Sequence, residues 1–120
     1  MTEAVCWVVQ LTVKPAALGE FQALTREMVA ATRSEPGAVC YERYLNDDGR
    51  SVHIYERYVD AAAAVAHLKR FEESFGERFV ALVDRGPVFV YGTLSHELRS
   101  LLDPLGAVYF EFLDGFFGFR

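Results

Sequence analysis

The chain has 120 residues, of which 52% are hydrophobic, and a net charge of −5 at pH 7. A chain of this length suits a single domain and buries roughly two thirds of its unfolded surface, enough for a hydrophobic core. The negative charge argues against a nucleic-acid partner, because phosphate binding needs a basic surface. No run of about 18 apolar residues occurs, so no membrane span is expected. Residues 1–10 include Glu3 and no basic residue, so we expect no signal peptide and a cytoplasmic protein.

Two elements are predicted near the start of the chain. Residues 4–13 are predicted to form the first strand, and they are apolar on nearly both faces, which is typical of a strand covered on both sides. Residues 17–33 are predicted to be helical, because their apolar side chains recur every three or four residues. Pro36 and Gly37 end this helix, since proline lacks the backbone N–H and glycine accepts turn geometry.

A β-hairpin is predicted next. Two runs rich in β-branched and aromatic residues, 39–45 and 52–59, flank the turn sequence Asn-Asp-Asp-Gly. Gly49 suits this turn because it can adopt a positive φ. Asp60 precedes an alanine-rich run, and its carboxylate is expected to cap a second helix over residues 61–69.

The second helical region is predicted to be interrupted before it ends. Phe75 and Gly76 break or bend it, and the helical pattern resumes over residues 77–84. An Arg-Gly-Pro sequence then ends the helix, and residues 87–94 are predicted to form the fourth strand. Within that strand, Gly92 indicates a bulge or a close approach by another group.

The C-terminal tail has the composition of a folded segment. Ser95 is expected to cap a short helix over residues 96–102, and the alternation of residues 107–113 predicts a further strand. Three phenylalanines crowd the chain end: Phe116, Phe117 and Phe119. Chain ends are usually polar unless they are docked, so we expect this tail to pack on its own domain or on a second copy.

This order of elements, β-α-β-β-α-β followed by a helix and a strand, predicts an α+β fold with a ferredoxin-like sheet. We divide the chain into a ferredoxin-like domain at 1–94 and a C-terminal helix–strand extension at 95–120. Right-handed crossovers place both long helices on the same face and leave the other face bare. Because the first strand is apolar there too, we expect a homodimer with its sheets packed face to face, a dimeric α/β barrel. The tail strand then has two alternative places, on its own domain or at the edge of the partner's sheet.

Cys6 and Cys40 are the only cysteines. In the predicted topology the third strand lies between the first and second, so these residues are two strand spacings apart, about 9–10 Å. That separation exceeds the reach of a disulfide. No nearby residues complete a tetrahedral zinc site, so no metal site is expected. We interpret both residues as small, buried, free thiols.

The candidate catalytic residues are single side chains, because no Walker loop, GxSxG or HExxH motif occurs. His67 lies in the second helix, where it either faces the sheet and takes a chemical role or is an ordinary, partly buried residue. Glu56 shares a strand face with apolar residues, where a carboxylate needs a partner or stays protonated. Arg43 on the neighbouring strand is the expected partner, and the structural alternative to catalysis is a cross-strand Arg43–Glu56 pair.

Aromatic side chains surround these candidates in the sequence. The hairpin contributes Tyr41, Tyr44, Tyr55 and Tyr58, which either line an aromatic pocket or simply suit strands. Trp7 on the first strand joins the same pocket or the core of the dimer.

A wider set of residues carries a family resemblance: Glu35-Pro36-Gly37, Tyr41-Glu42, Tyr55-Glu56, Tyr58, Asp60, Ala63 and His67. Their pattern, over about residues 4–94, is similar to that of the antibiotic biosynthesis monooxygenase family. The spacing across the hairpin and into the following helix is its most specific part. The resemblance implies a ferredoxin-like dimeric barrel with a pocket between the sheet and the helices.

The resemblance also implies a function. Family members include cofactor-independent oxygenases that act on quinols or aromatic polyketide intermediates. By this resemblance the chain would be a homodimeric monooxygenase for a small aromatic, quinol or polyketide-like molecule, with no cofactor and no metal. The predicted catalytic residues are His67, as the base, and Glu56. The predicted substrate-binding residues are Trp7, Tyr41, Tyr55, Tyr58 and Phe71.

The sequence also departs from the family pattern. Tyr58 stands where tryptophan is usual, and Lys69-Arg70-Phe71 replaces a common motif that carries a second histidine. Haem-degrading relatives use an asparagine on the first strand, and none occurs at 4–13, so haem degradation is not expected. The alternatives are a non-catalytic dimer that binds a small molecule, and an isomerase of a small ketone.

Overall fold

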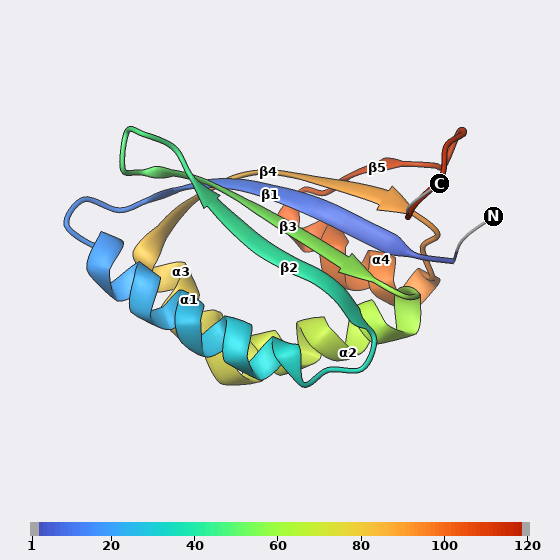
Figure 1. Ribbon diagram of the computed structural model, residues 1–120, viewed down its shortest axis with the longest axis horizontal. Coiled ribbons are helices and arrows are strands. Elements are labelled where there is room, and N and C mark those ends of the chain that lie inside the picture. The colour runs from blue at the N-terminus through green and yellow to red at the C-terminus, as the bar shows by residue number, and fades with distance from the viewer. Residues whose placement is uncertain (1–2, 119–120) are drawn as a thin grey trace.

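The computed structural model of this chain describes residues 3–118, and its helices lie on one face of a five-stranded sheet (Figure 1). The strands are β1 (Val5–Val13), β2 (Ala38–Leu45), β3 (Ser51–Tyr58), β4 (Val83–Gly92) and β5 (Val108–Phe110). The helices are α1 (Leu18–Arg33), α2 (Ala61–Phe71), α3 (Glu77–Leu82) and α4 (His96–Leu102). A π-helical turn at Glu72–Gly76 joins α2 to α3, and a 3-10 turn at Asp103–Leu105 follows α4.

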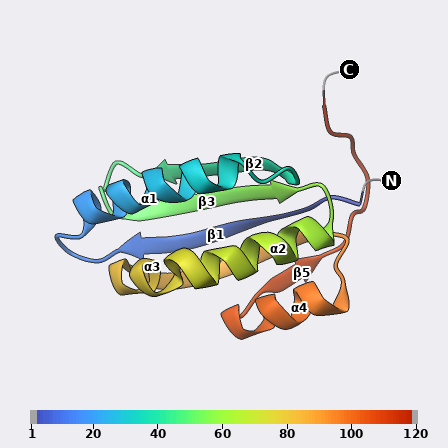
Figure 2. The ribbon, with the colours of Figure 1, turned by 90° about the horizontal axis from the view of Figure 1, so that it is seen from below.

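The strand order is β2-β3-β1-β4-β5, and β3 lies between β1 and β2 as predicted. The first four strands pair antiparallel with their neighbours, whereas β5 runs parallel to β4. This arrangement confirms the predicted α+β, ferredoxin-like fold with an additional C-terminal helix and strand. Figure 2 shows the helical face, where α1, the continuous α2–α3 segment and α4 form neighbouring rows over the sheet.

The core on the helical face consists of two clusters of buried side chains. One cluster includes Trp7, Tyr58 and Leu98 beneath α2 and α4, and the other includes Phe21 and Ile54 beneath α1. The C-terminal extension belongs to the first cluster, because α4 buries Leu98 and its neighbour Leu102 almost completely. The extension therefore contributes to the core of its own chain.

The tail strand differs from its prediction. It spans only Val108–Phe110, shorter than the predicted 107–113, and it pairs with β4 of the same chain, which is one of the two placements expected for the tail. Phe116 and Phe117 are largely exposed, and the Arg57 guanidinium lies over the Phe117 ring, 4.0 Å from its centre. The predicted contribution of Phe119 lies outside the described residues.

The boundary between α3 and β4 also differs from the prediction, because residues 85–87 lie within the strand instead of ending the helix before it. A Cβ atom on Gly86 would lie 2.4 Å from the backbone oxygen of Gln10, so only glycine allows β4 to approach β1 here. The β1–β4 register shifts at this point, and such an irregularity tolerates Pro87 inside a sheet. The predicted interruption at Phe75-Gly76 takes the form of the π-helical turn.

The two cysteines are free, as predicted, and both are partly buried. Cys6 on β1 and Cys40 on β2 are both in register with Arg57 of β3, one on each side of that strand, so β3 separates them. Burial and a hydrogen bond with Glu42 raise the pKa of the Cys40 thiol to about 11, which keeps it protonated at neutral pH.

The close approach at Gly86 predicts opposite effects for two glycine substitutions. Gly86→Ala places a methyl group against the backbone of β1 and should lower the free energy of unfolding by about 2 kcal/mol. The matched control is Gly19→Ala near the start of α1, where a Cβ meets nothing within 4 Å, and it should raise stability by roughly 0.5 kcal/mol. Urea denaturation measures both changes, and equal effects would contradict this account of the bulge.

Candidate functional site

The start of α2 is fixed by two local contacts. The Asp60 carboxylate accepts a hydrogen bond of 2.8 Å from the backbone N–H of Ala63, which confirms the predicted cap. A Cβ on Gly37 would lie 2.4 Å from the Cβ of Ala63, so the turn after α1 packs directly on this first helical turn. With α2 held in this way, His67 faces the sheet and only 4% of its surface is exposed.

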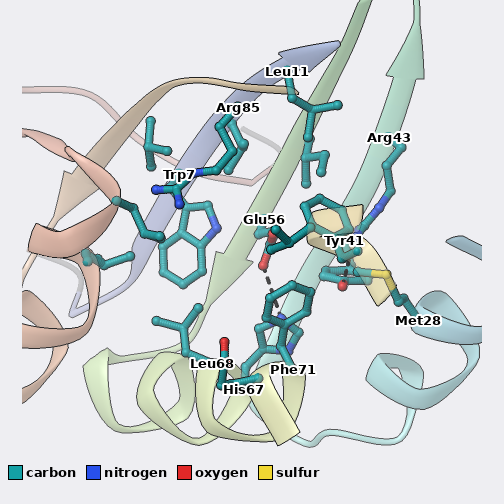
Figure 3. A pocket seen from close by; sticks show the side chains of 18 of the residues that line it. Trp7, Leu11, Met28, Tyr41, Arg43, Glu56, His67, Leu68, Phe71 and Arg85 are labelled. Atoms are coloured by element: carbon teal, nitrogen blue, oxygen red, sulfur yellow. Dashed lines mark hydrogen bonds and ion pairs between the residues drawn. The ribbon is translucent and has the colours of Figure 1, made fainter. Parts of the chain in front are cut away.

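His67 lies between two carboxylates. Its Nδ1 atom is 3.1 Å and 3.3 Å from the two Glu35 oxygens, and its Nε2 atom is 3.3 Å from Oε1 of Glu56. Figure 3 shows the imidazole below Glu56 and pointing toward it. A neutral imidazole carries a single N–H, so it can donate to only one of these carboxylates. Satisfying both contacts at once would take one more proton than the neutral imidazole carries, so this arrangement has the geometry to accept a proton.

Tyr58 completes this buried cluster. Its hydroxyl donates a hydrogen bond of 2.5 Å to Oε1 of Glu56, and its ring centre lies 5.0 Å from that of His67. Burial and, next, the negative charge of Glu56 raise the pKa of the Tyr58 hydroxyl far above its usual value. The hydroxyl therefore stays protonated and acts as a permanent donor to Glu56.

At the Glu35 end of the cluster, the carboxylate contacts a surface arginine, Arg70. Nη1 of Arg70 lies 3.3 Å from Oε2 of Glu35, and the Arg70 side chain is 59% exposed while that of Glu35 is 10% exposed. Glu35 thus links the buried imidazole to a solvated cation, whereas Glu56 faces the interior.

A cavity of about 210 Å³ lies between the sheet and the helices and brings most of the predicted site residues together. Its lining includes five residues from the sequence prediction: Trp7, Tyr41, Glu56, His67 and Phe71. Because the exposed residues Val80 and Leu105 also line it, the cavity reaches the surface beside α3. An engineered cavity of about 150 Å³ holds benzene, so this volume suits a substituted aromatic ring.

The two remaining predicted residues lie elsewhere. Tyr58 is fully buried behind the cavity wall, where it contacts His67 and Trp7. Tyr55 pairs in register with Val8 of β1, and as the direct neighbour of Glu56 it points to the opposite face of the sheet. The expectation that Tyr55 lines the pocket therefore does not hold.

The expected cross-strand pair between Arg43 and Glu56 does not form, since no ion pair joins these two described residues. Instead, Nη2 of Arg43 donates a hydrogen bond of 2.8 Å to the Tyr41 hydroxyl. Burial, followed by the charge of Glu56, raises the pKa of this hydroxyl, and the nearby guanidinium opposes that shift. Arg43 and Tyr41 thus form a hydrogen-bonded pair in the cavity wall, separate from Glu56.

Glu35 is the residue of the site to which sequence reasoning assigned no role, although its Glu-Pro-Gly segment was part of the family pattern. The sequence feature that could have indicated Glu35 is an acidic residue just after the end of α1, where its carboxylate lies beside the next helix.

Glu35 and Glu56 contact opposite nitrogens of the imidazole, so the two carboxylates do not converge on a common point. Within residues 3–118, no group of three or more His, Cys, Asp or Glu side chains is arranged to hold a metal ion. Over the same residues, no helix combines the length and the apolar character needed to cross a bilayer.

The fold and the cluster together define a ferredoxin-like α+β protein with a partly enclosed pocket bordered by a buried His67–carboxylate cluster. The family model described as antibiotic biosynthesis monooxygenase matches residues 4–72, and the chain belongs to this family. The family expected from the sequence is therefore confirmed. A search of curated proteins found no match to this chain.

Three solved structures illustrate the relationship. MupZ from Pseudomonas fluorescens has a TM-score of 0.84 and 24% identity, over 98% of this chain and 91% of that one. SnoaB from Streptomyces nogalater, described as a cofactor-independent oxygenase, has a TM-score of 0.65 and 20% identity, over 74% of this chain and 91% of that one. Rv0793 from Mycobacterium tuberculosis has a TM-score of 0.61 and 26% identity, over 78% of this chain and 97% of that one. Because the MupZ match spans nearly the whole chain, the C-terminal extension is part of the shared fold.

The position of Glu35 predicts its effect on stability. Glu35→Ala leaves Nδ1 of the buried imidazole without its partner and should lower the free energy of unfolding by about 1–3 kcal/mol. Glu35→Gln keeps an acceptor oxygen and should cost less. The matched control is Glu27→Ala on α1, because the Glu27–Arg78 pair is exposed and should contribute less than about 1 kcal/mol. If chemical denaturation gives Glu35→Ala and Glu27→Ala the same effect, the buried contact is not structural.

Proposed function

We propose that this chain is a cofactor-independent monooxygenase that oxidises a small phenol or hydroquinone, with the Glu56–His67 pair as its acid–base group. The observation that carries this proposal is the buried Glu35–His67–Glu56 cluster, which borders an otherwise mostly apolar cavity. Family membership supports oxygen chemistry, and the description of SnoaB as a cofactor-independent oxygenase supports the same chemistry for this fold.

The pocket needs to perform only a few tasks in such a reaction. It holds the aromatic ring against Trp7 and Phe71, removes the hydroxyl proton and keeps water away from the phenolate. The proton passes to the Glu56–His67 pair, where the imidazolium is stabilised by a carboxylate at each nitrogen. The electron-rich phenolate then reacts directly with oxygen.

The reaction balances without an added reductant. For a hydroquinone, one atom of the oxygen molecule forms a new C–O bond on the ring and the other leaves as water. The substrate supplies all of the electrons and becomes a hydroxyquinone. The proton first taken by the Glu56–His67 pair returns in the water that is released, so the cluster ends each turnover in its starting state.

The second candidate function is non-catalytic binding of the same kind of molecule. It is favoured by the fact that each ring nitrogen of His67 already has a partner, as in a structural histidine. An isomerase, the third alternative, would convert its substrate without consuming oxygen.

Oxygen uptake with a hydroquinone panel tests the proposed activity. The wild-type chain should consume oxygen in proportion to substrate, and His67→Ala should reduce the rate by about 100-fold or more, because general-base catalysis contributes about that factor. Tyr55→Phe is the matched control, since this tyrosine lies on the opposite face and should leave the rate unchanged.

Each failure of this test has a distinct meaning. Equal rates for wild type and His67→Ala would remove His67 as the base. If neither protein consumes oxygen but an added hydroquinone quenches the Trp7 fluorescence of both, the binding function is supported. Turnover under anaerobic conditions would indicate an isomerase.

The open face of the sheet supports a homodimer, which we propose as the functional assembly. Figure 1 shows that no helix covers the face opposite α1 and α2. Tyr91 and Phe110 stack on this face with ring centres 5.5 Å apart, and 37% and 47% of their surfaces are exposed. Contiguous exposed aromatic surface of this kind marks an interaction site, and a two-fold contact with a second copy buries the same patch on both chains.

Sedimentation velocity tests this assembly. Because α4 is part of the core, point substitutions are preferable to removal of the tail. The double substitution Tyr91→Glu and Phe110→Glu should convert a dimer into monomers. Val80→Glu places a charge at a comparably exposed position on the helical face and should leave the dimer intact. A wild-type chain that sediments as a monomer would contradict the proposal.

A further inference from the structure

The cavity contains an arginine that forms no ion pair with any residue in the described part of the chain. Arg43 lines the cavity, and its Nε and Nη1 atoms are buried without a hydrogen-bond partner. Its third nitrogen, Nη2, donates to the Tyr41 hydroxyl, and the guanidinium carbon lies 3.8 Å from the centre of the Tyr41 ring. A guanidinium stays charged at every physiological pH, and a buried charge is costly unless it is paired. Two donors of this fixed cation therefore lack an acceptor.

The acidic residues of the cavity wall do not fill this role. Glu56 already accepts from Tyr58 and contacts His67, and it forms no ion pair with Arg43. Glu72 also lines the cavity, but its side chain belongs to the exposed surface of the π-helical turn. The acceptor for Arg43 is therefore expected from the ligand.

The arrangement of the other groups indicates what the ligand looks like. Figure 3 shows Arg43 and Tyr41 on one side of the Glu56–His67 pair and Trp7 on the other. A molecule that spans the cavity therefore meets the partly buried Arg43 at one end, the Glu56–His67 pair in the middle and Trp7, with the exposed Arg85 beside it, at the other end. The volume of about 210 Å³ holds roughly an aromatic ring with a short side chain.

We propose that the ligand of this cavity is a small aromatic carboxylic acid, whose carboxylate accepts a charge-assisted hydrogen bond from an unpartnered N–H group of Arg43. The phenolic character of its ring rests on the proposed function, whereas the carboxylate rests on Arg43 alone. A carboxylate fits better than a phosphate, because the nearby charge of Glu56 repels a dianion more strongly than a monoanion. Arginine also forms short, charge-assisted hydrogen bonds with carboxylates.

Equilibrium binding in the absence of oxygen tests this inference. Trp7 is the only tryptophan of the chain and lines the cavity, so its fluorescence reports occupancy directly. The probes are 2,5-dihydroxyphenylacetate, its methyl ester and phenyl phosphate. Wild type should bind the acid at least about tenfold more tightly than the ester, as expected for charge-assisted hydrogen bonds, and more tightly than phenyl phosphate.

Variants of Arg43 and Arg85 show which arginine is responsible for the preference for the acid over its methyl ester. Arg43→Met should bind the acid and the ester equally, and it should fold, because it removes an unpaired buried charge. Arg43→Lys keeps the charge and should retain part of the preference, which provides a second variant if the first does not fold. Arg85→Met is the matched control, because Arg85 is the other arginine of the cavity wall and is exposed, so the preference should persist.

Several results would overturn the inference. Equal binding of acid and ester by wild type would do so, as would an acid preference that survives in Arg43→Met or the absence of any binding of the acid. Tighter binding of phenyl phosphate would replace the carboxylate site by a phosphate site. Since binding needs no oxygen, an acid preference without oxygen uptake would contradict only the proposed monooxygenase, and uptake without the preference would contradict only this inference.

Discussion

The imidazole of His67, held between Glu35 and Glu56, is the interaction on which the rest of the site depends. Its three residues come from α2, from the turn after α1 and from β3, so the contact exists only when all three segments are correctly placed. Burial of these charges is costly, and their mutual attraction compensates only when the geometry is good. The cap at the start of α2 and the close packing of Gly37 on that helix supply the necessary positioning.

The two ends of the cluster lie in different surroundings. On one side, Glu35 contacts Arg70, whose side chain is largely exposed, so the positive charge of this pair is solvated. On the other side, Glu56 is bound by the permanently protonated hydroxyl of Tyr58 and faces an apolar cavity. The cluster therefore connects an apolar cavity on one side to a solvated charge on the other.

The sequence predicted the parts of this site that depend on local rules. Strand alternation places Glu56 on an apolar face, and an acidic residue before an alanine-rich run indicates the helix cap. Periodicity left the orientation of His67 open, and only the family resemblance directed it toward the pocket. Periodicity fixes a face but not a partner, so the Glu35–His67 contact, which joins residues 32 positions apart, was not predictable from it. Arg43 illustrates the same limit, because strand alternation placed it near Glu56 while the tertiary structure directs it to Tyr41. For Tyr55 the sequence did contain the answer, since consecutive strand residues face opposite sides and Glu56 faces the cavity.

The π-helical turn between α2 and α3 has a consequence for how this pocket can diversify. A π-type turn adds about one residue to the helix, which rotates everything after it by roughly 100°. Phe79 and Val80, which line the cavity from α3, owe their orientation to that added residue, whereas His67 precedes the turn and does not. Gain or loss of a single residue there would re-aim the far wall without moving the acid–base cluster. Pocket shape can therefore change through helix length while Glu35, Glu56 and His67 keep their positions.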